Sequence, residues 1–199
     1  MEDRTIKKYL EELSSPTPTP GGGSVGNIML SFSAGLAAMV CGLTNGLESY
    51  IDELRNLKDQ FLNLSYEDEK SFNLVMEAYK LSKNSEEEKK IRRQRIDDAL
   101  KNATLTPLKS IKLSKELIPF LNILIEQGNK NAISDVGVSI INLQGGALSC
   151  YLNVIINLKS IKDKNFIDSV INEVNEIKEY IVKWCDINLK KIIDKIIEE

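Results

Sequence analysis

Two aspartates stand where a carboxylate could transfer protons. Asp68 lies in the acidic run 67–69, directly before an apolar helical pattern, and Asp135 closes the run GNKNAISD at 128–135. A carboxylate whose pKa is raised in a dry crevice can act as an acid or a base near neutral pH. An acidic run is also typical of a solvated surface, and an acid in the first turn of a helix complements the helix dipole. The residues alone therefore leave both roles open.

Histidine is absent from all 199 residues. Its absence excludes Ser-His and Cys-His nucleophile pairs, histidine metal ligands and the commonest general base. Proton chemistry must then run on carboxylates, Lys, Tyr, Cys or the substrate itself. Cys41, Cys150 and Cys185 are far apart and form no CxxC motif, so we expect no metal site.

The three cysteines and residues 1–8 indicate the cellular compartment of the protein. All three cysteines lie in apolar helical patterns, and we expect them to be buried thiols of a reducing cytoplasm. Residues 1–8 are charged and lack the apolar core of a signal peptide. With 26 Lys and Arg against 29 Asp and Glu, the net charge is -3, so we expect no nucleic-acid partner.

A segment rich in proline and glycine, SPTPTPGGGS at 15–24, leads into an apolar stretch. The prolines exclude a helix within this segment, and Ser24 is a suitable N-cap for the helix that follows. Free main-chain N–H groups at such a helix start can hold an anion or a carbonyl group. The segment lacks the GK[ST] of a phosphate-binding loop, and no strand precedes it as a dinucleotide site requires.

The hydrophobic pattern is helical along the whole chain. Ser85 with Glu88 three residues later predicts a capped helix start. Six or seven helices with short connections predict an all-α antiparallel helical bundle, formed by one domain over 1–199. The expected helices cover 5–14, 24–46, 48–83 (as one helix or two), 86–127 with kinks near Pro107 and Pro119, 132–158, and a last helix from about 164 to 197.

Two stretches are unusually apolar, since no charged residue occurs between Leu13 and Leu47 or between Val136 and Leu158. A membrane span is the obvious alternative. Polar residues and glycines interrupt the first stretch, and flanking aromatic and basic clusters are missing. We therefore expect two buried central helices and no membrane association. Small residues that share one line of the first helix would let a neighbour approach closely: Ser24, Ser31, Gly35, Ala38 and Gly42.

The second apolar helix carries one line of polar and small residues. At 100° per residue, this line contains Asp135, Ser139, Asn142, Gly146, Ser149, Asn153 and Asn157. A buried polar group without a partner costs about 1–3 kcal/mol, so the line needs partners. These partners are either neighbouring helices or the contents of a crevice, and the sequence leaves both possibilities open.

Four segments together resemble a known family. They are LEELSS running into PTPGGGSV (10–25), LAAMVCGLT (36–44), DEKSF (68–72) and GNKNAISDVGV continuing to NVIINL (128–158). In this order and spacing they resemble the cyclodeaminase domain of the formiminotransferase-cyclodeaminase family and the small stand-alone methenyltetrahydrofolate cyclohydrolases. The resemblance implies an all-α homodimer with a folate pocket near the dimer interface.

The resemblance also implies a reaction at one carbon of a tetrahydrofolate derivative, which is a substrate and not a bound cofactor. We expect a 5-formiminotetrahydrofolate cyclodeaminase, which releases ammonia and forms 5,10-methenyltetrahydrofolate. The alternative is a 5,10-methenyltetrahydrofolate cyclohydrolase, which forms 10-formyltetrahydrofolate. A non-catalytic helical binding protein is the further alternative.

By the same resemblance, Asp68 is the first candidate for proton transfer and Asp135 the second, although either could instead bind the pterin ring. The residues implied to bind substrate are Gly21, Gly22, Gly23 and Ser24 through main-chain N–H groups, and Asn129, Asn131, Asn153 and Asn157 through shape or side-chain polarity. The chain departs from the family pattern at 27–30, where small residues are usual and Asn27 stands first.

Overall fold

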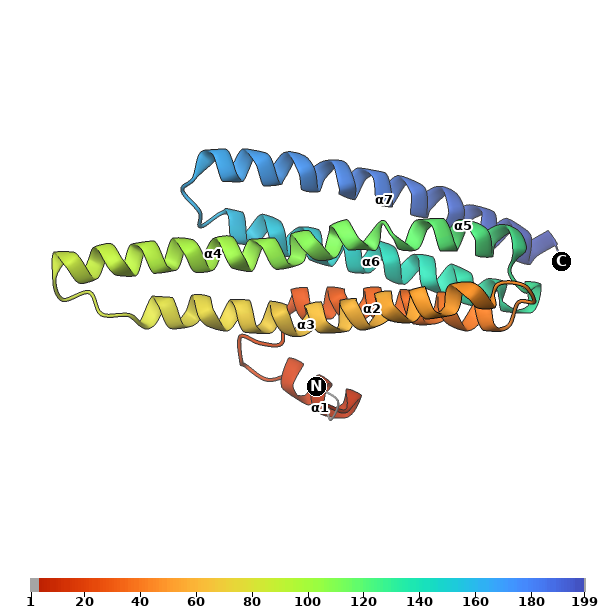
Figure 1. Cartoon of the computed structure of the whole chain (residues 1–199), viewed down its shortest axis with the longest axis horizontal. Helices are drawn as coiled ribbons and strands as arrows, with labels where there is room; N and C mark the ends of the chain where they lie inside the picture. Colours follow the sequence, from red (N-terminus) through yellow and green to blue (C-terminus); the bar gives the residue numbers. More distant parts are fainter. Residues whose placement is uncertain (1–3, 199) are drawn as a thin grey trace.

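The computed structural model describes residues 4–198, which form seven α-helices (Figure 1). Helices α2 to α7 run along the long axis of the molecule, and α1 lies to one side of this bundle (Figure 1). The prediction of an all-α bundle is confirmed. The elements are α1 (Ile6–Leu13), α2 (Gly22–Gly42), η1 (Glu48–Tyr50), α3 (Ile51–Lys80), α4 (Glu86–Ser114), α5 (Leu117–Gln127), η2 (Lys130–Ala132), α6 (Ile133–Leu158) and α7 (Lys164–Glu198).

The two uncharged helices α2 and α6 pack against each other at the centre. Helix α3 covers another side of α2, while α4 and α7 pack on α6. Glycines allow the close approach, because a Cβ on Gly146 would lie 2.8 Å from the carbonyl oxygen of Gly26. Both helices are long and apolar enough to cross a membrane, but 50% and 39% of their most apolar windows are buried inside the bundle.

Paired serines join α2 to α6 at mid-height. The hydroxyl of Ser33 donates to the carbonyl of Ser139 at 2.9 Å, and the hydroxyl of Ser139 donates to the carbonyl of Ser33 at 2.8 Å. Both residues are fully buried. In this part of the polar line of α6, the partners are therefore a neighbouring helix and not a ligand.

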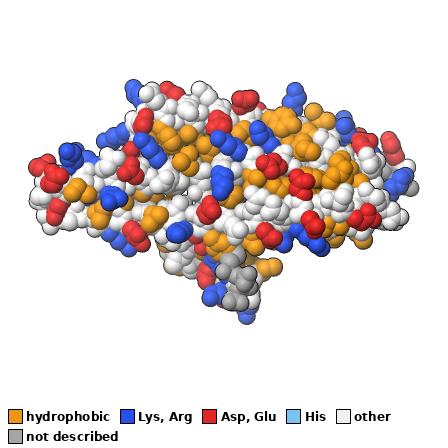
Figure 2. Space-filling view, in the orientation of Figure 1, with side chains coloured by type: hydrophobic (Ala, Val, Ile, Leu, Met, Phe, Trp, Pro, Cys, Tyr) orange, Lys and Arg blue, Asp and Glu red, His pale blue; other side chains and the backbone are white. Residues whose placement is uncertain are grey.

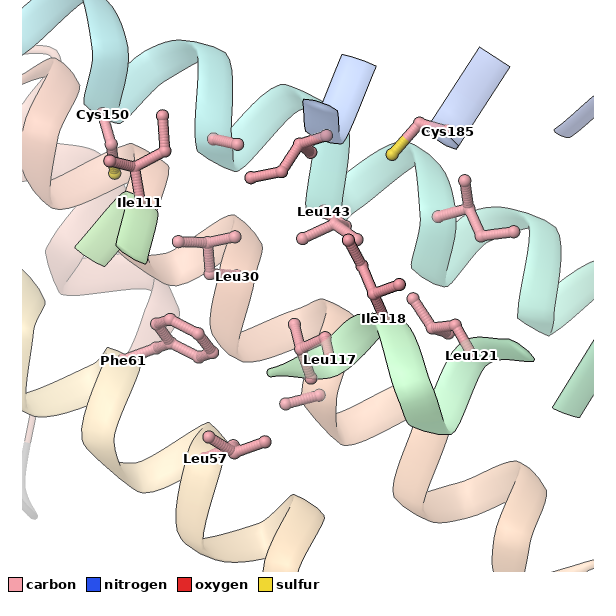
Figure 3. Close-up of a cluster of buried hydrophobic side chains, with 14 of the residues drawn as sticks. Leu30, Leu57, Phe61, Ile111, Leu117, Ile118, Leu121, Leu143, Cys150 and Cys185 are labelled. Carbon is pink, nitrogen blue, oxygen red and sulfur yellow. The ribbon is translucent and has the colours of Figure 1, made fainter. Parts of the chain in front are cut away.

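The hydrophobic core runs between helices α2 to α7, and Figure 3 shows part of it. Leu30, Phe61 and Leu143 meet there from three different helices and are fully buried. Cys150 and Cys185 flank the same cluster (Figure 3), and all three cysteines are buried and free, as predicted. The face seen in Figure 2 carries charges of both signs, interspersed with hydrophobic side chains.

Helix boundaries follow the local chemistry. The side chain of Thr5 caps α1, and Ser85 with Glu88 forms the predicted capping box at the start of α4. The expected helix 86–127 is interrupted at 115–116 rather than merely kinked. The reason is Pro119, which has no N–H to offer the carbonyl four residues earlier and clashes with it.

The start of α2 differs from the prediction. Ser24 is not the N-cap: Gly21 holds that position, and Gly22 and Gly23 already belong to the helix. Glycine is poor in helix interiors but is tolerated at the first turn, where the chain must pass close to another group. The hydroxyl of Ser24 is consequently free for longer-range contacts, which are described below.

Candidate active site

The Asp68 side chain points at the first turn of α2. Asp68 lies on α3, and its carboxylate sits directly over Gly23, where an added Cβ would be 2.6 Å from the Asp68 Cγ. The main-chain N–H of Ser24 donates a hydrogen bond to the carboxylate. The positive end of a helix dipole therefore faces this acid. The predicted N–H cradle exists, and a carboxylate of the same chain binds in it.

The environment of Asp68 favours a proton exchange near neutral pH. Burial raises the pKa of Asp68 to about 6, the neighbouring negative charge of Glu69 adds to the rise, and the Ser24 N–H opposes it. The thiol of Cys150 is fully buried, and its pKa is raised to about 12 by burial and then by the charge of Asp68. Asp68 can therefore both accept and return a proton near pH 6.

The glycine segment and Asn153 lie beside this acid. The amide nitrogen of Asn153 would be 3.2 Å from a Cβ on Gly22, and it donates to the carbonyl of Ser149 at 2.8 Å. Gly22 is exposed and Asn153 half-buried. The structure thus brings together five sequence-predicted site residues beyond Asp68: Gly21, Gly22, Gly23, Ser24 and Asn153.

Asn157 has a structural partner. Pro107 lies inside α4 and has no N–H for the carbonyl of Ala103, which is four residues earlier. The Asn157 amide donates to this oxygen at 2.9 Å. If Asn157 binds substrate as predicted, the substrate must therefore compete with the Ala103 carbonyl for the Asn157 amide. This contact replaces the hydrogen bond that Pro107 cannot make within α4.

The loop asparagines and Asp135 lie at the opposite end of the bundle. Asn129 binds the end of α2, because its N–H donates to Thr44 Oγ1 and its amide to the carbonyl of Leu43, both at 2.9 Å. Asn131 follows in the same turn, and Asp135 is in the first turn of α6. The 21 residues of α2 separate this end from Asp68 by about 30 Å at about 1.5 Å per residue. Within a single chain, Asp135, Asn129 and Asn131 therefore do not come near Asp68.

Asn27, the first departure from the family pattern, is fully buried. Its amide nitrogen donates to the carbonyl of Gly23 at 3.0 Å, one turn earlier. Its Oδ1 atom is buried without a hydrogen-bond partner. Asn27 therefore supports the helix turn beneath Asp68 and does not line an open surface.

Sequence reasoning missed the polar contacts around Glu69. The Ser24 hydroxyl donates to Glu69 Oε1 at 2.9 Å, and Arg4 Nη1 donates to both Glu69 oxygens at 2.9 and 3.1 Å. Ser65 and Tyr9 hydrogen-bond the Ser24 hydroxyl at 2.7 and 3.1 Å. The spacing 65, 68, 69 on one helix could have indicated Ser65 and Glu69. No local pattern indicates Arg4 or Tyr9, which lie about 60 residues away from Glu69.

Within residues 4–198, no group of three or more His, Cys, Asp or Glu side chains could hold a metal ion. The chemistry of this site consists of a buried carboxylate at a helix N-terminus with a second carboxylate beside it.

Comparisons with known proteins place this geometry in a family. A family model described as formiminotransferase-cyclodeaminase matches residues 5–176. The chain belongs to the formiminotransferase-cyclodeaminase family. A methenyltetrahydrofolate cyclohydrolase from Methylorubrum extorquens is 36% identical over 182 residues, covering 86% of this chain and 88% of that protein.

Further relatives carry the other activity in their names. A formimidoyltransferase-cyclodeaminase from Mus musculus is 29% identical over 185 residues, and the chain spans only 34% of its length. The crystal structure of a formiminotetrahydrofolate cyclodeaminase from Thermotoga maritima matches with a TM-score of 0.84 and 29% identity, and 98% of each chain is covered. The Thermotoga maritima enzyme thus shares this fold along nearly the whole chain.

Proposed function

We propose that this protein is a folate one-carbon enzyme that hydrolyses 5,10-methenyltetrahydrofolate to 10-formyltetrahydrofolate. The observation that carries the proposal is the Asp68 carboxylate, held at the start of α2 with a pKa of about 6. In this environment, Asp68 can accept a proton and return it during one turnover. The likeness to a stand-alone cyclohydrolase, matched over 88% of its length, favours this reaction over the cyclodeaminase reaction that the sequence favoured.

The reaction needs no enzyme nucleophile, which agrees with the absence of histidine. Water attacks the methenyl carbon between N5 and N10, and Asp68 takes one proton from that water. A tetrahedral carbon results. The bond from this carbon to N5 then breaks, N5 receives the proton back, and the remaining hydroxyl loses its proton to solvent as the formyl group forms. Asp68 is thus first the base and then the acid.

Binding would orient the substrate on the exposed side of this acid. Gly21 and Gly22 offer main-chain atoms without side chains, and the half-buried Asn153 amide lies beside them. Orientation of a water and a carbon at one carboxylate can contribute several kcal/mol to the barrier reduction. The proposal requires no metal or bound cofactor, and the tetrahydrofolate derivative is the substrate.

The cyclodeaminase reaction is the second candidate, favoured by the match along 98% of the chain to the cyclodeaminase from Thermotoga maritima. There N10 attacks the carbon of the protonated formimino group and loses its own proton to Asp68, and Asp68 passes this proton to the nitrogen that leaves as ammonia. Both reactions pass through a tetrahedral carbon between two nitrogens, so one carboxylate serves either.

We further propose a homodimer that packs through the outer faces of α2 and α6. These faces expose large apolar side chains, namely Phe32 and Met39 on α2, Leu43 directly after it, and Val138, Ile141, Leu152 and Ile156 on α6. Met29 and Gly145 are in contact where the two helices meet, so the two faces are continuous. An apolar surface of this kind is typical of an interface between subunits. The two glycine-rich apolar helices would thereby be covered in a cytoplasmic protein.

The homodimer would also give a role to residues 129–135, which lie far from Asp68 in the same chain. If the two copies are antiparallel about a two-fold axis, the 129–135 end of one subunit lies beside the Asp68 end of the other. Asp135, Asn129 and Asn131 would then complete the site of the second subunit. Asp135 would bind the pterin ring, whose amino group and ring N–H suit a carboxylate, while Asp68 transfers protons.

An absorbance assay tests the function, since methenyltetrahydrofolate absorbs in the near ultraviolet and its products do not. Accelerated loss of added methenyltetrahydrofolate supports the cyclohydrolase. Its appearance from 5-formiminotetrahydrofolate, with ammonia release, supports the cyclodeaminase instead. A folded protein that turns over neither substrate would contradict both and leave a binding protein.

A further inference from the structure

The N-terminal helix α1 is attached to the bundle mainly by polar contacts. None of its residues is buried, and Ile6 and Leu10 are 70% and 54% exposed. A cavity of about 850 Å³ lies between its apolar face and helices α2 and α3. Hydrophobic burial therefore contributes little to the position of α1.

Arg4 provides a strong attachment. Its guanidinium forms an ion pair with Glu12 of α1, makes two hydrogen bonds to Glu69 of α3, and lies 4.7 Å from the centre of the Tyr9 ring. The Arg4 and Glu69 side chains are only 14% and 16% exposed. A pair this shielded from water interacts more strongly than a surface ion pair.

The hydrogen bonds from Glu69 lead to Asp68 in a fixed direction. An ionised carboxylate only accepts, so the Ser24 hydroxyl must donate its single proton to Glu69. Tyr9 and Ser65 must then donate to the Ser24 oxygen. The main-chain N–H of Ser24 donates to Asp68. Ser24 thus links the two adjacent carboxylates, one through its side chain and the other through its backbone.

We propose that Glu69 is a positioning residue for Asp68, and that the N-terminal arm, residues 4–13, keeps Glu69 in place through Arg4. The arm orders Glu69, Glu69 orders Ser24, and Ser24 fixes the carboxylate of Asp68. This inference rests on the proposed function only in giving Asp68 a catalytic task. Arg4 and Tyr9 of the docked arm thereby act on the active site, although they lie outside the bundle.

The negative charge of Glu69 raises the pKa of Asp68, and the neutral side chains around Asp68 do not mask this effect. Tyr9 of α1 and Cys150 of α6 face Asp68, and burial raises the pKa of both side chains, so they stay neutral at physiological pH. Glu69 on the same helix is the anion that acts on Asp68. Removing the charge of Glu69 therefore measures directly how strongly Glu69 acts on the pKa of Asp68.

Two substitutions separate the charge of Glu69 from its geometry. Glu69→Gln keeps an oxygen that accepts from Ser24 and Arg4 but removes the negative charge. We expect it to lower the apparent pKa in the pH–rate profile by about half a unit to one unit. Glu69→Ala removes the acceptor as well, and we expect kcat to fall about tenfold with a smaller change in KM.

Substitutions on the arm test the role of Arg4. Arg4→Gln should reduce kcat about tenfold, and Arg4→Lys should restore part of this loss because it keeps the charge without the two-pronged contact. Lys7→Gln is the matched control, since the Lys7 side chain is 88% exposed and 4.0 Å from its partner Glu11. It should behave as the wild type in both rate and melting temperature.

A titration of the Asp68 carboxyl carbon by NMR in the full chain tests the coupling without turnover. The inference predicts a lower Asp68 pKa in Glu69→Gln than in the wild type. The same Asp68 pKa in both proteins, or an Arg4→Gln variant whose kinetics match those of Lys7→Gln, would overturn it. A shifted titration in a protein that turns over no folate would refute the proposed function alone.

Discussion

Gly23 and Asp68 share one small space: the Asp68 carboxylate fills the position that a side chain on Gly23 would take, with the Asp68 Cγ 2.6 Å from the added Cβ. No rotation of an alanine methyl group avoids this overlap, because a Cβ position is fixed by the backbone. The third glycine of the PTPGGGSV segment is therefore explained by the approach of a carboxylate to the helix start, and not by an unusual backbone angle.

Gly23→Ala is expected to displace Asp68 and to reduce kcat at least about tenfold, because the Ser24 N–H can no longer hold the carboxylate in place. Gly35→Ala is the matched control in the same helix, since nothing lies within 4 Å of its added Cβ. It should leave turnover unchanged and stabilise the fold by about 0.5–1 kcal/mol. Equal turnover in the two variants, measured by the absorbance assay, would contradict the contact.

The raised pKa of Asp68 predicts a pH-dependent stability. The folded state favours the protonated acid, so Asp68 costs stability as the pH rises from its ordinary pKa of 3.8 through about 6. Asp68→Asn should therefore melt several degrees above the wild type at pH 8, and the difference should shrink toward pH 4. Glu67→Gln, a change in the same acidic run at a half-exposed side chain, should show no such trend. A melting difference independent of pH would count against a buried Asp68.

Asn153 and Asn157 lie on the same line of α6 and are predicted to respond differently. Asn157→Leu leaves the Ala103 carbonyl without a partner and should lower stability by about 1–3 kcal/mol. Asn153→Leu should weaken folate binding more than stability, because the hydrogen bond that its amide donates stays within its own helix. Denaturant unfolding and folate titration measure the two effects. A stability loss at Asn153 with unchanged affinity would assign that residue a structural role as well.

The local features of the fold were predictable from sequence because each depends on neighbours along the chain. Examples are the capping box at Ser85 and the thiols buried in apolar helices. The start of α2 was misplaced because Ser24 is an N-cap type whose hydroxyl instead binds Glu69, 45 residues away. Near Pro119 the sequence predicted only a kink, whereas the structure has a break between α4 and α5.

The site was predictable in part. Asp68, the glycines and Asn153 were identified from motif residues, and the structure places them together. The roles of Arg4, Tyr9 and Glu69 depend on how α1 folds back onto α3, which no periodicity reveals. The separation of Asp135 from Asp68 depends on helix length and direction, so it became visible only in the assembled bundle.

Mixing of inactive subunits tests the composite site. If Asp68 of one subunit acts with Asp135 of its partner, a hybrid of Asp68→Asn and Asp135→Asn subunits has one doubly altered site and one intact site. Random exchange should then restore up to about a quarter of wild-type activity. No recovery, although co-purification of two differently tagged subunits shows that hybrids have formed, would mean that the two aspartates do not meet across the interface.

We propose that Asp68 moves the proton in a reaction at the methenyl carbon. The decisive measurement is the rate of methenyltetrahydrofolate loss catalysed by Asp68→Asn and by the wild type, at equal concentrations of folded protein. We expect the rate of Asp68→Asn to be lower by at least about 100-fold, with the helical content unchanged. A variant that retains near-normal turnover would contradict it.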